Sequence, residues 1–93
     1  MKLAIYSFKD NALGCFTNPF YDDRPTENVG IGVARAIASS TKKDTYKHKV
    51  LYKIGEFDDA LGTFSEIGHI LVLDCDELLA DLESHEKNGK GSK

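Results

Sequence analysis

No stretch of the sequence is apolar for long enough to cross a membrane, and no segment has the pattern of a secretion signal. A membrane-spanning helix needs about 20 mostly apolar residues. The opening MKLAIYSF is only a short apolar alternation without a small-residue cleavage site. We therefore expect a soluble protein that has no membrane partner and stays in the cytoplasm.

Cysteine is scarce, and Cys15 and Cys75 lie far apart in the chain. Neither belongs to a C-x-x-C pair or to a cluster with histidine, which argues against a zinc site. We expect two reduced thiols in the protein core.

Motifs of catalysis are also missing. No nucleophile stands in an elbow such as G-x-S-x-G. The G-x-G of VGIGVARA lacks the third glycine and the following acidic residue of a dinucleotide site. The sequence therefore predicts no catalytic residues, no metal and no cofactor, and it favours a binding protein over an enzyme.

The charge that is present is distributed unevenly. The 93 residues carry a net charge of −3, which argues against a protein that coats nucleic acid by bulk attraction. Lysines dominate residues 42–53, whereas residues 74–86 contain six acidic residues and neither lysine nor arginine.

Hydrophobic periodicity predicts one small α+β domain, residues 1–86, followed by a disordered basic tail, residues 87–93. We expect a mainly antiparallel sheet of about five strands and two helices in the order ββαβββα. The expected strands cover residues 2–9, 14–20, 48–57, 63–67 and 69–74, and the expected helices cover residues 26–39 and 75–86.

Local signals refine these elements. Thr26 and Asp74 are the expected N-caps of the two helices. Gly30 and Gly32 are expected either to let the first helix approach the sheet closely or to mark a late start of that helix. In the strand of residues 48–57, the alternation assigns His48, Val50, Tyr52 and Ile54 to the core face and Lys47, Lys49, Leu51 and Lys53 to the other.

The stretch KIGEFDDALGTF places two acidic residues and a glycine between two strand-like runs. Asp58 and Asp59 suit the first positions of a turn, and Gly62 suits the left-handed position that closes it. The oxygen pattern does not fit an EF-hand, and adjacent carboxylates on an extended chain point to opposite sides. We predict a hairpin turn rather than a calcium loop or an acid–base pair.

The lysine-rich segment is the strongest candidate for a binding site. Lysines on a loop and a strand can follow a phosphate backbone, and rings among them can stack on unpaired bases. An ordinary solvated strand is the alternative. The candidate nucleic-acid-binding residues are Lys42, Lys43, Tyr46, Lys47, Lys49 and Lys53, with Tyr46 as the expected stacking residue.

The acidic second helix has two readings. Its acids can form a solvated face over a leucine seam, or the helix can be an interaction element. In the second reading Leu78, Leu79 and Leu82 close a dimer, while the acids engage a basic partner or compete with nucleic acid for the lysines.

Three motifs, KLAIYSFKDNALGCFTNPF, PTENVGIGVARAI and VLYKIGEFDDALGTF, follow one another in an order that resembles the small nonstructural proteins of gokushovirus-type microviruses. The likeness covers residues 2–66, and YKIGEFDDALG is its specific part. The acidic segment 74–86 lies outside it. The resemblance implies a non-virion protein of a phage with a single-stranded DNA genome, working in the bacterial cytoplasm, in a family described as DNA-binding or replication-associated.

The sequence thus predicts an accessory protein, expected to be a homodimer, that binds single-stranded DNA through its lysine-rich strand and loop. The alternative is an adaptor that binds a viral or host protein without nucleic acid. A sheet in so short a chain leaves edges that a second copy can cover.

Overall fold

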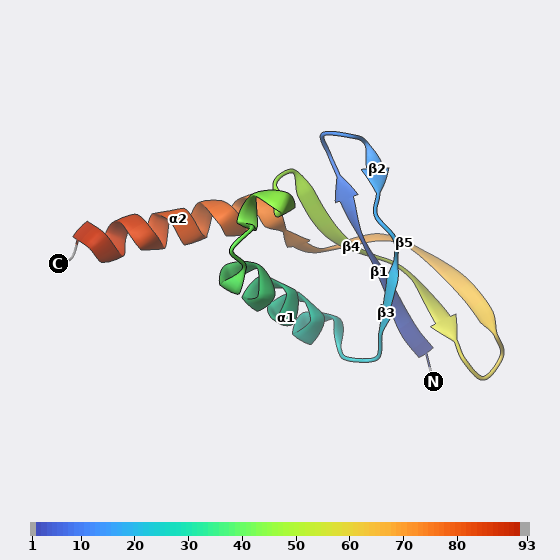
Figure 1. The fold of residues 1–93 in the computed structure, drawn as a ribbon. Helices are drawn as coiled ribbons and strands as arrows, with labels where there is room; N and C mark the ends of the chain where they lie inside the picture. The colour runs from blue at the N-terminus through green and yellow to red at the C-terminus, as the bar shows by residue number, and fades with distance from the viewer. Residues whose placement is uncertain (1, 92–93) are drawn as a thin grey trace.

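A computed structural model describes the backbone of residues 2–91 and the side chains of residues 2–84 (Figure 1). The elements in chain order are β1 (Lys2–Asp10), β2 (Cys15–Phe16), β3 (Phe20–Asp22), α1 (Thr26–Ser39), the short 3₁₀ helix η1 (Lys43–Tyr46), β4 (Lys49–Asp58), β5 (Thr63–Asp74) and α2 (Cys75–Gly91). The expected α+β class is confirmed.

All strand pairs of the sheet are antiparallel, in the order β2-β1-β4-β5, with β3 also pairing with β1. The strands are divided differently from the prediction, with three before α1 and two after it. Phe20–Asp22 forms a separate short strand beside β1. The sequence predicted two strands, 63–67 and 69–74, but residues 63–74 form one. The pairing with β4 is irregular around Gly68, whose φ of 76° lets the strand continue.

The core lies between α1 and one face of the sheet. Tyr6, Val29 and Leu51 are fully buried and form its centre. The Tyr6 hydroxyl lies 3.0 Å from Thr26 Oγ1, and Phe20 stacks on the Tyr6 ring at 5.4 Å between centroids. These contacts fix the start of α1 against β1.

Gly30 explains how close the helix comes. A Cβ atom on Gly30 would lie 3.2 Å from Val72 Cγ1 of β5, so the expected close approach is confirmed there. The expected N-cap of α1 is wrong by one residue. Pro25 precedes the helix without a side-chain cap, and Thr26 is the first helical residue.

The prediction for the faces of β4 is wrong. Leu51 is fully buried and lies opposite Phe8 on the helix-covered face. Tyr52 lies opposite Ser7 on the other face. Residues 49–53 pair with β1 in regular register, so the alternation holds there but with the opposite set of side chains facing α1.

Two turns of nearly identical sequence, DNALG at residues 10–14 and DDALG at residues 58–62, close the hairpins β1–β2 and β4–β5. In both, the first aspartate side chain accepts hydrogen bonds from the backbone N–H groups two and three residues on, at 2.9–3.2 Å. The final glycines have φ angles of 74° and 66°. The hairpin turn predicted at residues 58–62 is confirmed.

The helix α2 begins as predicted and extends further. Asp74 Oδ1 accepts hydrogen bonds from the N–H groups of Asp76 and Glu77, at 3.0 and 3.4 Å. The helix continues to Gly91 rather than ending near residue 86, so residues 87–91 of the expected tail are helical. Residues 92–93 lie outside the described chain. Of the two expected core thiols, Cys75 is buried and Cys15 is exposed.

Candidate nucleic-acid interface

The lysine-rich segment does not form one open face. Lys42 is exposed just before η1, and the half-buried Lys43 donates a hydrogen bond to the carbonyl of Ser40 at 2.9 Å. Lys47 forms a 3.5 Å ion pair with Asp44 of η1, in which both side chains are well exposed. These lysines lie on the helix-covered side of the sheet.

The two lysines within β4 are less accessible still. Lys53 has a side chain that is only 19% exposed and pairs with Glu56 at 3.7 Å. Lys49 is half-buried near Cys75 and Asp10. The expected row of phosphate-binding lysines along this strand is therefore interrupted by burial and by intrachain pairing.

Tyr46, the expected stacking residue, is half-buried. Its ring tilts against Phe8 at 6.2 Å between centroids, on the helix-covered face. This contact anchors η1 to the sheet and leaves only part of the ring for a ligand.

Rings accessible to solvent lie instead on the opposite face, which we call the outer face. Cross-strand partners share a face of a sheet. Phe16 lies opposite Lys9, and Tyr52 lies opposite Ser7, so both rings point away from the face of β1 that α1 covers.

A cluster of three rings gathers at one end of the outer face. The centroid of His69 is 5.1 Å from Phe16 and 5.7 Å from Tyr52, and the Phe16 and Tyr52 centroids are 6.3 Å apart. Lys9 Nζ lies 6.0 Å from the Phe16 centroid, at the outer limit of a cation–π contact. Phe16 and His69 are exposed and Tyr52 is half-buried. We call these four residues the ring platform.

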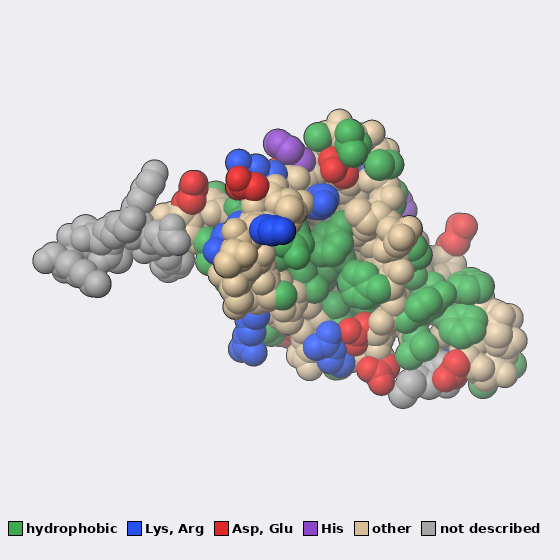
Figure 2. Space-filling model, viewed as in Figure 1, with side chains coloured by type: hydrophobic (Ala, Val, Ile, Leu, Met, Phe, Trp, Pro, Cys, Tyr) green, Lys and Arg blue, Asp and Glu red, His purple; other side chains and the backbone are tan. Residues whose placement is uncertain are grey.

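A second ring cluster occupies the other end of the outer face. Phe57 contacts Tyr21 at 5.9 Å and Phe64 at 4.9 Å between centroids. Tyr21 and Phe64 are 51% and 67% exposed. Figure 2 shows hydrophobic side chains gathered over the end of the β4–β5 hairpin.

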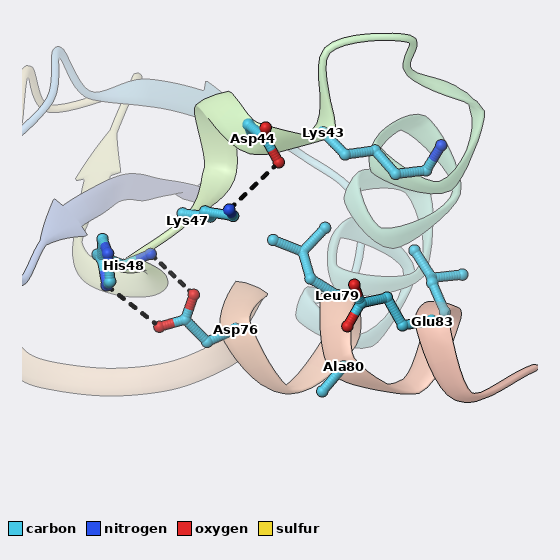
Figure 3. A pocket seen from close by; sticks show the side chains of 9 residues that line it. Lys43, Asp44, Lys47, His48, Asp76, Leu79, Ala80 and Glu83 are labelled. Carbon is cyan, nitrogen blue, oxygen red and sulfur yellow. Dashed lines mark hydrogen bonds and ion pairs between the residues drawn. The ribbon is translucent and has the colours of Figure 1, made fainter. Parts of the chain in front are cut away.

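The start of α2 and the segment around η1 face each other on the helix-covered side of the sheet, across a groove of about 550 Å³. Lys43 and Lys47 lie on its η1 wall, and Leu79, Leu82 and Glu83 on its α2 wall (Figure 3). Leu78, the third residue of the expected interface, is half-buried and is not among the lining residues. We call this feature the η1–α2 groove.

One contact closes an end of the η1–α2 groove. His48, at φ 65°, donates its backbone N–H to Asp76 at 2.8 Å, and its Nδ1 lies 3.7 Å from the same carboxylate (Figure 3). This carboxylate therefore fixes the left-handed residue through which η1 enters β4. Across the described side chains, no lysine of η1 or β4 forms an ion pair with an acid of α2.

The pKa values of Asp22 and Cys75 depart from their usual values for different reasons. Hydrogen bonds from Arg24, one of them 2.7 Å long, lower the pKa of Asp22 at the end of β3. Burial, together with the nearby Asp74 and Asp76 carboxylates, raises the pKa of the Cys75 thiol to about 11. The Cys75 thiol is therefore protonated at neutral pH and is not a nucleophile there.

The described residues contain no group of three or more His, Cys, Asp or Glu side chains placed to hold a metal ion. Among the described helices, none is long and apolar enough to cross a membrane. Comparisons with models of protein families, with curated proteins and with solved structures give no match.

Sequence reasoning missed Lys9, Phe16 and His69 of the ring platform. Lys9 and Phe16 stand on opposite sides of the DNALG turn, where a hairpin register places them face to face. That signal was available. The position of His69 depends on the irregular pairing around Gly68, which no local pattern encodes.

Proposed function

We propose that the protein binds single-stranded nucleic acid on the outer face of its sheet, with unpaired bases stacking on the ring platform. The observation that carries this proposal is the exposed ring pair Phe16 and His69, supported by Tyr52 and flanked by the amine of Lys9. An antiparallel sheet with rings on one face and helices on the other is a common platform for single strands.

The chemistry of the site favours unpaired bases over a duplex. Stacking requires access to the flat face of a base, which is available in a single strand and hidden in a double helix. Every base has such a face, so this contact tolerates any sequence. The resemblance to microvirus nonstructural proteins agrees with a ligand of this kind and with an accessory role in handling a single-stranded DNA genome.

The salt dependence of the affinity distinguishes binding at the ring platform from binding along the lysines of residues 42–53. Each phosphate contact to a single strand contributes a slope of about −0.7 to log K against log salt concentration. Five bound lysines would give a slope of about −3.5, whereas Lys9 with one further contact gives about −1.4. We therefore expect a shallow salt dependence.

The experiment is fluorescence anisotropy of labelled single-stranded and duplex oligonucleotides titrated with wild-type protein, Phe16→Ala and His69→Ala. Each substitution removes a stacking surface and is expected to weaken single-strand binding about tenfold. Phe64→Ala is the matched control, because Phe64 is an exposed ring at the other end of the same face.

A Lys42/Lys43/Lys47 triple alanine variant tests the alternative placement of the site. Its affinity should stay within about twofold of the wild type, since stacking supplies most of the binding. A steep salt dependence of the affinity, together with loss of binding in this variant, would show that the binding site is formed by these three lysines instead. Equal affinities of the wild type and Phe16→Ala would overturn the ring platform.

A second candidate function is supported by the cluster of Tyr21, Phe57 and Phe64. Exposed apolar patches on soluble proteins commonly mark protein interfaces. An adaptor role predicts that Phe64→Ala abolishes capture of a viral or host protein, whereas Phe16→Ala leaves it intact. Affinity purification with both variants distinguishes this function from nucleic-acid binding.

A further inference from the structure

The η1–α2 groove has two lysines and Asp44 on one wall, and two leucines and Glu83 on the other. Lys43 and Lys47 stand on the η1 wall, and Leu79 and Glu83 stand on the α2 wall (Figure 3). The two lysines are held by groups on their own side of the groove, a backbone carbonyl and Asp44. An ammonium group has three donors, so each lysine keeps donors for a partner, and neither lysine is paired with Glu83 across the groove.

The helix α2 projects from the body formed by the sheet and α1 (Figure 1). It spans Cys75–Gly91, a length of about 25 Å. The Cα radius of gyration is 15.4 Å, against about 12 Å for a compact chain of this length. A helix gains most of its stability from packing an apolar stripe, so α2 gains from a partner along the groove.

We propose that the η1–α2 groove is a dimer interface in which the α2 helices of two copies pack antiparallel, each against the groove of the other. A two-fold axis brings the same surface of both chains together. The lysine wall of one copy then faces the acidic wall of the other, and the half-buried leucines Leu79 and Leu82 meet at the centre.

Charge complementarity favours a second copy as the occupant. A partner for this groove needs acidic side chains for the lysines, basic side chains for Glu83 and apolar side chains for Leu79 and Leu82. The chain itself carries all three features in the matching arrangement. The groove lies on the helix side of the sheet, whereas the ring platform lies on the outer face, so dimerisation leaves the proposed nucleic-acid site open.

The decisive experiment uses two charge reversals, Lys43→Glu and Glu83→Lys, in full-length protein studied by sedimentation. Each variant alone places like charges opposite each other twice per dimer, and we expect its dimer dissociation constant to rise about tenfold. An equimolar mixture of the two variants pairs opposite charges at both positions and should recover wild-type association as a heterodimer.

The mixture distinguishes contacts between chains from contacts within one chain, because an intrachain pair would not be restored by mixing. Leu79→Ala should also weaken association, with Leu13→Ala as the control, since Leu13 is 77% exposed on the β1–β2 turn. Circular dichroism of each variant establishes that it is folded.

Two results would overturn the proposed dimer: wild-type protein that stays monomeric at millimolar concentration, or a dimer insensitive to both reversals and to Leu79→Ala. Sedimentation without nucleic acid keeps this test separate from the proposed function. Loss of oligonucleotide binding in Phe16→Ala, with association unchanged, would concern the ring platform alone.

Discussion

At the scale of single residues, one buried polar contact fixes the docking of α1. The Tyr6 side chain is fully buried, and its hydroxyl meets Thr26 Oγ1 at the first residue of the helix. A buried hydroxyl without a partner costs more than the net value of the hydrogen bond it loses. The pair therefore specifies where α1 begins on the sheet.

Tyr6→Phe should lower the free energy of unfolding by about 1 kcal/mol, because it removes the hydroxyl and leaves Thr26 Oγ1 without this partner. Urea denaturation measures the difference. Tyr21→Phe is the control, since Tyr21 is half exposed, and its change should stay within about 0.5 kcal/mol. Equal losses in the two variants would contradict a role for the Tyr6 hydroxyl.

Cys75 makes the stability depend on pH in the alkaline range. The pKa of its thiol is about 11 in the folded protein and 9.0 as the reference value, so the folded state holds the proton more tightly. This contribution is fully present below pH 9 and is lost as the pH rises toward 11.

The urea midpoint of the wild type should therefore fall more between pH 8 and pH 10.5 than that of Cys75→Ala. The comparison cancels the titration of lysines and tyrosines, which both proteins share. Parallel curves for the two proteins would show that burial does not shift the pKa of this thiol.

At the scale of elements, repeated turn chemistry was easier to predict from the sequence than the faces of strands. The DDALG turn was predictable because aspartate and glycine have local roles that need no tertiary context. The helices were predictable from their periodicity. The faces of β4 were not, because the adjacent residues Val50 and Leu51 lie on opposite faces and both are buried.

The candidate site was harder to predict than the faces of β4, because it depends on how the strands pair. The lysines were visible in the sequence, but their burial was set by the sheet, and Lys53 pairs with Glu56 of its own strand across an irregularity in the pairing with β1. The ring platform contains residues from four strands, and no local sequence pattern predicts such a cluster.

The two Asp-first turns should contribute similarly to stability. Asp10→Ala and Asp58→Ala each remove an acceptor for two backbone N–H groups and should cost about 1 kcal/mol. The effects of the double variant should add, since the turns are separate. Chemical denaturation of the three proteins tests this, and a loss confined to one variant would contradict equivalent turns.

At the scale of the whole molecule, the protein is elongated, with extents of 57 × 27 × 20 Å. The sheet and α1 form the body, and α2 projects from it (Figure 1). A projecting helix and an exposed outer face give one small chain two separate surfaces for partners.

Small-angle scattering should show this shape directly. At infinite dilution the radius of gyration should exceed the roughly 12 Å of a compact chain, in keeping with the Cα value of 15.4 Å. It should rise with concentration in the wild type, and in Lys43→Glu the same rise should need about tenfold higher concentration. A dilute value near 12 Å would mean that α2 folds back on the body.

The turn at residues 58–62 also sets an order of events in folding. It joins β4 directly to β5, so that pairing forms at low cost in loop entropy. The pairing of β1 with β4 instead places Lys2 opposite Asp58, and these two residues are far apart in the sequence. Stopped-flow kinetics should show Asp58→Ala slowing folding, whereas Asp10→Ala mainly speeds unfolding. Of the five strands, β1 would then be among the last to take its place in the sheet.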